Sequence, residues 1–410
     1  MVARSRRGTS LLLLSILVLG GLSWSLAPPA PAGALGGAWH VISAPRVPGR
    51  IYGQPVCISD THCLVIFNQA GRAGVMISTN AARSWRSVGS ASMVGGLEAL
   101  ACTTSSVCMA MGFHGSLPRV SSLALERSSD GGLSWQKLTP PTGLGGSQPG
   151  NQLEALACSG PSDCVAVGQI TTSRPPPGCS PPSCTYSQPN VGLGAVVLTS
   201  SDAGATWSTS TPAGGFEDAY SAACSSSGLC QVVGIGMPFC PPGARCGVVG
   251  AALGSSPTVS VGAGTSPPGP SWSTETVPHG VFAINGVTCL SGSQCVAVGQ
   301  SADSTLGHGV VLVTHDAGHT WSLLPAPADS NSLMSITCVS TRVCLVTGGL
   351  GRSYEPVIFE STNAGSTWHV IAHFPTLSNL VRSTCTPGGL CLATGTVGIG
   401  PSEYGELLAN

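Results

Sequence analysis

The stretch CLSGSQCVAVGQ, residues 289–300, places two cysteines five residues apart and follows the second with a short apolar run. The same spacing occurs seven times along the 410 residues, and successive pairs begin 45, 56, 66, 65, 49 and 47 residues apart. A repeat of about 45–50 residues is typical of one four-stranded β-propeller blade. The pairs are Cys57 with Cys63, Cys102 with Cys108, Cys158 with Cys164, Cys224 with Cys230, Cys289 with Cys295, Cys338 with Cys344, and Cys385 with Cys391.

A second motif, a turn that ends in tryptophan, follows most of the apolar runs. The copies are SSDGGLSW (128–135), SSDAGATW (200–207), THDAGHTW (314–321), STNAGSTW (361–368) and the weaker STNAARSW (78–85), and the fourth repeat keeps only Ser271-Trp272. This pattern resembles the Asp-box (BNR, sialidase-type) repeat, which implies a β-propeller. We expect Asp130, Asp202 and Asp316 to accept hydrogen bonds from turn amides rather than to act as catalysts or calcium ligands.

The repeat predicts four antiparallel strands per blade. Strand A ends at the first cysteine, strand B begins at the second, strand C precedes the tryptophan turn and strand D starts at the tryptophan. Each cysteine pair then forms a local disulfide that closes the A–B turn, and so short a loop contributes about 2 kcal/mol. The fold class expected is an all-β, seven-bladed propeller.

The last repeat starts at Cys385 but has no tryptophan before the end of the sequence. The segment GGAWHVISAP (36–45) resembles AGSTWHVIAHFP (364–375), so we expect Trp39 to begin the missing strand beside residues 404–408. Asn410 would fall near the acidic position of the split turn. The ring would thus be closed by the N-terminal strand, which removes exposed sheet edges. The alternative is six complete blades with ragged ends.

Composition and the N-terminus indicate export. Charged residues make up 8% of the chain and Lys137 is its single lysine, so no basic patch suggests nucleic-acid binding. Three arginines precede the apolar residues 11–22, and the small residues 30–32 fit a cleavage site. We therefore expect a signal peptide over 1–32 and one propeller over 33–410, secreted or extracytoplasmic and monomeric. An uncleaved anchor is the alternative. The even count of 18 cysteines agrees with an oxidising compartment.

Binding residues are expected on the loops opposite the disulfides, where the B–C and D–A connections share one face. Two B–C loops are enlarged, residues 169–194 and 235–271. We expect two more local disulfides in them, Cys179 with Cys184 and Cys240 with Cys246; cross-pairing and a four-cysteine zinc site are the alternatives. No cofactor or metal is predicted. The candidate ligand-binding residues are Arg46, Arg50, Tyr52, Arg174, Tyr220, Arg352, Tyr354 and Arg382.

Two classes of function fit these features. Photosystem II assembly factors are similar single, exported propellers without catalysis, which implies a binding or assembly module for a protein or glycan. The alternative is a sialidase-like or other glycoside hydrolase. The arginine, tyrosine, glutamate and aspartate set of sialidases is matched only by a faint echo in Arg46-Val47-Pro48. Xyloglucanase-like hydrolases use paired aspartates on two propellers, and this chain has room for one. We therefore favour the non-enzymatic class.

Overall fold

A computed structural model describes most of the chain from Leu35 onward. The chain divides into Met1–Ala34 and Leu35–Asn410, and only the second unit is described. Within it the description omits residues 36, 43–49, 70–71, 89–94, 117–118, 142–143, 145–151, 173–191, 211–215, 237–248, 256–271, 276, 302–306 and 399–402.

Several sequence predictions fall on residues outside this description. The expected signal peptide is one of them, and the candidate ligand-binding residues Arg46 and Arg174 are two more. The four cysteines of the enlarged loops also lie outside the described residues, so their expected pairing stays a prediction: Cys179 with Cys184 and Cys240 with Cys246.

The described residues form an all-β propeller of small antiparallel sheets, which confirms the predicted fold class at that level. Seven four-stranded sheets are present, numbered here by the order of their first strands. Sheet 1 contains β2 (Arg50–Cys57), β3 (Cys63–Gln69), β4 (Arg72–Ser78) and β5 (Arg86–Val88). Sheet 2 contains β6 (Gly95–Cys102), β7 (Cys108–Ser116), β8 (Arg119–Ser128) and β9 (Gln136–Lys137). Sheet 3 contains β10 (Gln152–Ser159), β11 (Asp163–Thr172), β12 (Gly192–Ser200) and β13 (Ser208–Ser210).

Sheets 4 to 7 repeat the same order. They are β14 (Phe216–Cys224), β15 (Cys230–Gly236), β16 (Val249–Ser255) and β17 (Trp272–Thr274); β18 (Val281–Cys289), β19 (Cys295–Ser301), β20 (Gly309–Thr314) and β21 (Ser322–Leu324); β22 (Ser330–Cys338), β23 (Cys344–Leu350), β24 (Glu355–Ser361) and β25 (His369–His373); and β26 (Asn379–Cys385), β27 (Cys391–Val397), β28 (Tyr404–Ala409) and β1 (His40–Val41).

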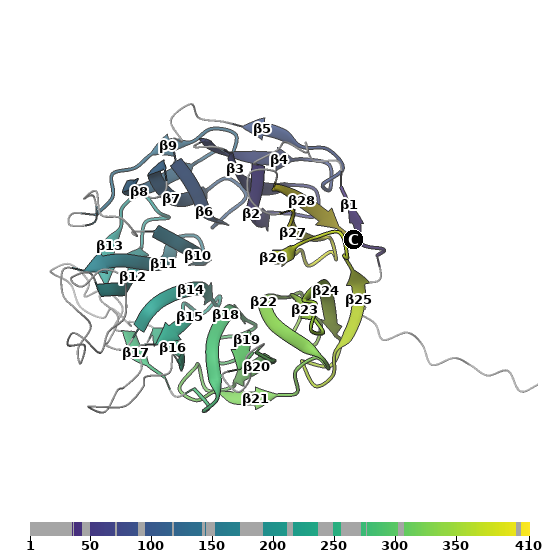
Figure 1. Ribbon diagram of the computed structural model, residues 1–410. Coiled ribbons are helices and arrows are strands. Elements are labelled where there is room, and N and C mark those ends of the chain that lie inside the picture. Colours follow the sequence, from purple (N-terminus) through teal and green to yellow (C-terminus); the bar gives the residue numbers. More distant parts are fainter. Residues whose placement is uncertain are drawn as a thin grey trace, which may run out of the picture. The chain divides into compact units, whose positions relative to one another are not determined.

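The first strand of each sheet is the innermost one. Each first strand contacts the first strand of the next sheet, and β26 of sheet 7 contacts β2 of sheet 1 (Figure 1). The second, third and fourth strands lie progressively farther out. The seven first strands therefore surround the middle of the unit, where side chains from sheets distant in sequence can meet.

Sheet 7 contains strands from both ends of the described chain. His40 pairs with Ala409 and Val41 with Leu408, and the amide of Ile42 donates to the carbonyl of Leu407 at 2.9 Å. Strand β1 begins at His40, one residue later than the start at Trp39 that the sequence comparison predicted. The segment is held further by the Leu35 amide, which donates to Glu360 Oε1 at 2.7 Å.

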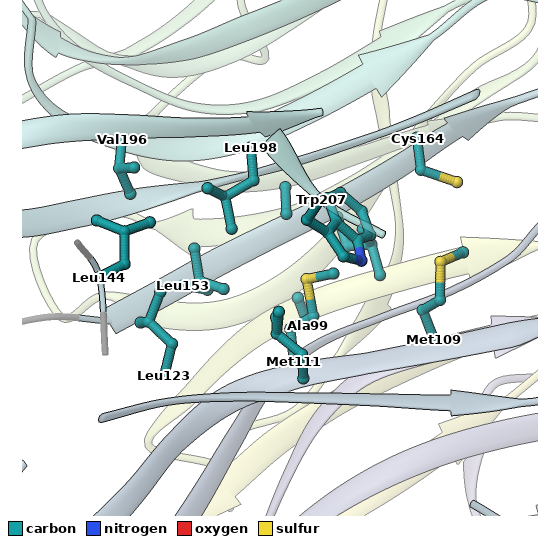
Figure 2. Packing of buried hydrophobic residues seen from close by; sticks show 13 residues of the cluster. Ala99, Met109, Met111, Leu123, Leu144, Leu153, Cys164, Val196, Leu198 and Trp207 are labelled. Atoms are coloured by element: carbon teal, nitrogen blue, oxygen red, sulfur yellow. The ribbon is translucent and has the colours of Figure 1, made fainter. Parts of the chain in front are cut away.

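Apolar clusters between neighbouring sheets form the core. In one cluster, Met109 and Met111 of sheet 2 pack with Leu153, Leu198 and Trp207 of sheet 3 (Figure 2). The tryptophan lies between two sheets as the sequence predicted, and its Nε1 donates to the Gly204 carbonyl at 3.0 Å. Burying one such side chain stabilises the fold by about 1.5–3 kcal/mol. Packing between neighbouring sheets thus supplies the buried apolar contacts that a single thin sheet cannot make by itself.

Among the described residues seven local disulfides are present, one in each sheet, which confirms the predicted pairing of every Cys-x5-Cys motif. In every sheet the two cysteines are also cross-strand partners at or near the end of the first hairpin. The motif therefore marks the same point of each sheet, and other positions can be compared by counting from its first cysteine.

In sheet 3 the first strand ends one residue later, and the second begins one residue earlier, than predicted. We expected strand A to end at Cys158 and strand B to begin at Cys164, whereas β10 continues to Ser159 and β11 begins at Asp163. The reason is an extra cross-strand pair, Ser159 with Asp163, beyond the pair of disulfide-bonded cysteines. The hairpin of this sheet is thus one pair longer, and Cys158 and Cys164 lie inside their strands rather than at the ends.

Candidate functional site

The disulfide turns and the tryptophan turns lie side by side. In five sheets a backbone amide of the tryptophan turn donates to a carbonyl of the disulfide turn, at 2.7–3.1 Å. These pairs are Ala81 to Thr61, Gly131 to Ser106, Ala203 to Ser162, Ala317 to Ser293 and Ala364 to Arg342. The two turn types thus build one edge of these five sheets, and the same backbone bond recurs in each of them.

The acidic side chain of the tryptophan turn accepts its hydrogen bonds from residues of the same turn. Asp316 accepts from the Thr320 amide at 2.9 Å and from the hydroxyls of Thr320 and Thr314 at 2.6 and 2.7 Å. The hydrogen bonds from Thr320 and Thr314 lower the pKa of Asp316 to about 2. A carboxylate whose oxygens are occupied in this way is a poor acid–base catalyst, in agreement with the structural role predicted for it.

The innermost strands carry a different repeated feature. Each has a β-bulge or register irregularity at the position four residues before the first cysteine. Bulges redirect side chains and often occur next to binding or active sites. All seven residues at this position are half-buried, and their chemistry differs around the unit: Gly53, Glu98, Glu154, Tyr220, Asn285, Met334 and Val381. We call these the inner bulge positions.

Charged groups from three sheets gather among the inner bulge positions. Glu98 of β6, Glu154 of β10 and Arg382 of β26 interact electrostatically, and the Arg382 Nη2 atom donates to the Tyr220 carbonyl of β14 at 3.4 Å. We call these four residues the inner cluster. Sheets 4 and 7 are three sheets apart around the unit, so this hydrogen bond joins innermost strands that are not neighbours.

The carboxyl of Glu98 has an unusual affinity for protons. Burial raises its pKa, the negative charge of Glu154 raises it further, and Arg382 lowers it, with a resulting value of about 7. Burial lowers the pKa of Arg382, and the charges of Glu154 and Glu98 raise it. The inner cluster therefore holds one guanidinium against two carboxyl groups, of which one titrates near neutral pH.

A neighbouring sheet fixes the backbone beside Glu98. The Asn68 side chain of β3 donates through Nδ2 to the Leu97 carbonyl at 2.7 Å and accepts at Oδ1 from the Leu97 amide at 2.8 Å. Leu97 is the last paired residue before the bulge. Asn285 makes a related link, since its Nδ2 donates to the Leu333 carbonyl of sheet 6 at 2.9 Å. Side-chain amides thus hold the bulged strands in place.

The structure brings together two of the candidate ligand-binding residues, Tyr220 and Arg382. Their expected location in loops is wrong, because both lie within innermost strands. Arg50 and Tyr52 likewise belong to β2 rather than to a loop. Tyr52 is 2% exposed and packs in the apolar cluster that sheets 1 and 7 share. Strand pairing therefore begins earlier than the sequence spacing suggested, and it draws the aromatic ring into the core.

Arg352 and Tyr354 lie where they were expected, in the turn between β23 and β24. Both are exposed, and Tyr354 has a φ of 54°. The turn is anchored by the Gly351 amide, which donates to the Asp329 carbonyl at 2.9 Å. These contacts connect the turn to the start of sheet 6 rather than to the inner cluster.

Glu98 and Glu154 are functional candidates that the sequence reading missed. Both occur in the identical hexapeptide LEALAC, residues 97–102 and 153–158. A charge inside an otherwise apolar strand, at the same distance from the cysteine in two repeats, was the signal that could have revealed them. Among the described residues no group of three or more His, Cys, Asp or Glu is arranged to hold a metal ion. In the same part of the chain, no helix has the length and apolar character to cross a membrane.

No protein-family model matches the sequence, and no curated protein matches it. The fold places the chain in the class of all-β propellers, and solved structures of that class are similar to it. YCF48 bound to D1 peptide has a TM-score of 0.56 at 12% identity, over 91% of this chain and 96% of that one. YCF48 from Cyanidioschyzon merolae has a TM-score of 0.53 at 11% identity, over 91% and 98%.

An enzyme is also among the similar structures. The GH74 xyloglucanase from Xanthomonas campestris has a TM-score of 0.52 at 15% identity, over 88% of this chain and 54% of the enzyme. At such identities the likeness shows the fold alone. A peptide-binding protein and a glycoside hydrolase share the architecture, so the function must be argued from the residues of this chain.

Proposed function

We propose that this protein is an exported, non-catalytic binding module that recognises a segment of another protein through the inner bulge positions and the loops beside them. The observation that carries the proposal is the contrast between two sets of equivalent positions. At the turn edge the same bonds recur in five sheets. At the inner bulge positions one backbone geometry presents glycine, acidic, aromatic, amide, thioether and aliphatic residues.

This contrast separates structural from recognition roles within one molecule. A position that must stabilise every repeat is expected to carry the same group in each, whereas a surface that reads a partner needs different groups at defined places. The mixture of Tyr220, Met334 and the charges of the inner cluster suits a peptide, because a peptide offers apolar, polar and charged groups together. The peptide bound by YCF48 supports this partner class for the fold.

Three further statements belong to the same proposal. We infer that the sheets act as seven blades closed by the N-terminal strand, which the β1–β28 pairing and the contact of β26 with β2 support. We infer that the tryptophan turns are Asp-box repeats, which their shared hydrogen bonds support. Export through a cleaved signal peptide fits the seven disulfides, which indicate an oxidising environment outside the cytoplasm.

A glycoside hydrolase is the second candidate, and the two glutamates favour it. Glycosidases pair two carboxyl groups and raise the pKa of the one that donates a proton, as burial does for Glu98. Against this role, the Arg382 guanidinium belongs to the same cluster and balances one of the carboxylates. An internal cation of this kind suits a stable polar network better than a site open to a sugar ring.

Two assays on the full exported chain separate these candidates. A random peptide library is panned on immobilised protein, and enriched peptides are measured against the wild type, Tyr220→Ala, Glu154→Gln and the control Glu403→Gln. The proposal expects peptides whose affinity falls about tenfold or more in the first two variants and is unchanged in the control. Hydrolysis of xyloglucan or of a fluorogenic sialoside that is lost in Glu98→Gln would overturn it, as would glycan-array binding without any peptide enrichment.

A further inference from the structure

The backbone nitrogen of Leu35 has an acceptor unlike that of its counterparts in other sheets. Leu35 lies four residues before Trp39, as Ala364 lies four residues before Trp368, and the strand registers of sheets 7 and 6 agree with this alignment. In five sheets the amide at this position donates to a carbonyl of the disulfide turn. The Leu35 nitrogen donates instead to Glu360 Oε1 of the neighbouring sheet, at 2.7 Å. Among the described turns, this is the one in which the nitrogen faces a carboxylate.

The repeat does not require an acid at the position of Glu360. The residues in the same register of the other six sheets are uncharged or basic: Ile77, Arg127, Thr199, Gly254, Val313 and Ala409. Glu360 is 8% exposed, its cross-strand partner His369 is exposed, and no side-chain cation of the described residues forms an ion pair with it. A buried carboxylate is costly unless it is paired, and one amide balances it weakly.

The sequence before Leu35 contains a second motif for removal of a signal peptide. Signal peptidases need small residues at the first and third positions before the bond that they cut. Ala30-Pro31-Ala32 fits this rule, and so does Ala32-Gly33-Ala34, which places the cut between Ala34 and Leu35. The second cut coincides with the start of the unit that contains the sheets. It would convert the Leu35 nitrogen from a neutral amide into a cation.

We propose that a signal peptidase cuts the Ala34–Leu35 bond and that the new α-ammonium of Leu35 forms an ion pair with Glu360. The proposal rests on the cleaved export signal proposed above and specifies its site. Water adds across the peptide bond, with its hydroxyl on the Ala34 carbonyl carbon and its proton on the Leu35 nitrogen. The new carboxylic acid then releases a proton and the amine takes one up. A distance of 2.7 Å suits a bond between an ammonium group and a carboxylate.

The burial of Leu35 sets the order of events. Its side chain is 9% exposed and belongs to the apolar cluster that contains Phe374 and Leu377. The peptidase needs an accessible segment, so the cut precedes the folding of sheet 7. The cut then supplies the positive charge that fixes the N-terminal segment against sheet 6. A chain that is cut elsewhere keeps a neutral amide beside Glu360.

N-terminal sequencing of protein secreted from the full chain tests the site of the cut. The expected start is LGGAW, residues 35–39. Ala34→Leu disrupts the second motif and should move the start to Gly33, whereas Ala30→Leu disrupts the first motif and should leave the start at Leu35. A wild-type start at Gly33 would overturn the proposal and leave export standing. A chain retained uncut in the membrane would overturn both, and neither result touches the peptide-binding assay.

Amine acetylation with an N-hydroxysuccinimide ester near neutral pH tests the ion pair. The chain has one lysine, the exposed Lys137, so the secreted protein offers two amines that mass spectrometry can follow separately. The Leu35 amine should react about tenfold or more slowly in the wild type than in Glu360→Gln, because the paired ammonium holds its proton. Lys137 should react equally in both. Glu355→Gln, which changes an acid of the same strand, should resemble the wild type.

Equal rates for the Leu35 amine in the wild type and Glu360→Gln would overturn the ion pair. The two leader variants give a second comparison in which every residue of the sheets is unchanged. Secreted Ala30→Leu protein is expected to be identical to the wild type, while secreted Ala34→Leu protein carries two extra residues and a neutral amide at Leu35. The Tm of the latter should be lower by about 2 °C or more. Equal Tm values would contradict a stabilising role of the new terminus.

Discussion

The side chain of Asn68 belongs to sheet 1 but completes the backbone hydrogen bonding of sheet 2. It forms hydrogen bonds with both the amide and the carbonyl of Leu97, beside a bulge that interrupts the regular cross-strand pairing. A side-chain amide carries its donor and its acceptor on two separate atoms, so it can bond the carbonyl and the amide of one residue at the same time. The position of Glu98 therefore depends on a residue 30 positions earlier in the sequence.

Replacing this amide should be costly. In Asn68→Ala two partly buried backbone groups lose their partners, and the free energy of unfolding should fall by about 2–3 kcal/mol. Urea unfolding at constant pH measures the loss. The exposed Gln136 offers a matched amide, and Gln136→Ala should change stability by less than about 0.5 kcal/mol. Equal effects of the two substitutions would show that the Asn68 bonds do not support the bulge.

Asp316 permits a test at a single turn. Asp316→Ala removes the acceptor for three hydrogen bonds and should lower the free energy of unfolding by about 1–3 kcal/mol. Asp316→Asn should lose much less, because Asn363 serves the equivalent turn of sheet 6, where its Oδ1 accepts from the Thr367 amide at 2.9 Å. Calorimetry at neutral pH compares the two variants.

The same carboxylate sets a dependence on acid. Its pKa is about 2 in the folded protein and ordinarily 3.8, so its stabilising effect is complete above about pH 3.8 and lost as the pH falls through about 2. The Tm difference between the wild type and Asp316→Asn should therefore shrink from about pH 5 toward pH 2. A difference that stays constant over that range would contradict the assigned hydrogen bonds.

At the scale of strands and turns, the cysteine spacing predicted most of what the structure contains. The end of the first strand, the start of the second and the disulfide between them follow from Cys-x5-Cys to within one residue, because a bridge over so short a loop demands a tight hairpin. The end of the third strand and the start of the fourth follow from the tryptophan turn to within one residue. These features are local, and local chemistry can be read from sequence.

The starts of the innermost strands could not be read in the same way. A bulge changes the alternation of inward and outward side chains, so Tyr220 and Arg382 looked like loop residues although they pair in β14 and β26. The inner cluster was hidden for a related reason. Its members come from repeats that are far apart in sequence, and their meeting depends on the curvature of the whole unit.

At the scale of the molecule, sheet 7 joins residues from the two ends of the described chain. Gly37 lies against Asn410, and β1 completes the sheet that β26 begins. A short linker from Asn410 to Gly37, combined with new termini at the exposed residues His279 and Gly280, would make every sheet continuous in sequence. We expect such a circular permutant to fold with all seven disulfides of the described sheets and a Tm close to that of the wild type.

Calorimetry and non-reducing peptide mapping check the permutant. A second version, with the same linker but with termini inside β27, serves as the matched control and should be strongly destabilised, because it interrupts the buried strand between two others. Failure of the first version to fold, with intact linker and export, would show that the pairing of β1 with β28 does not hold the two ends together.

The disulfides of this chain also bear on how it can be made. Every described bridge joins cysteines six positions apart within one hairpin, so a cysteine can meet its correct partner before the next repeat has been synthesised. Oxidation can then proceed repeat by repeat in any order, and wrong pairs between distant repeats are disfavoured by the longer loops that they must close. For the described cysteines, local pairing thus limits the number of wrong disulfides, which otherwise grows steeply with the number of cysteines.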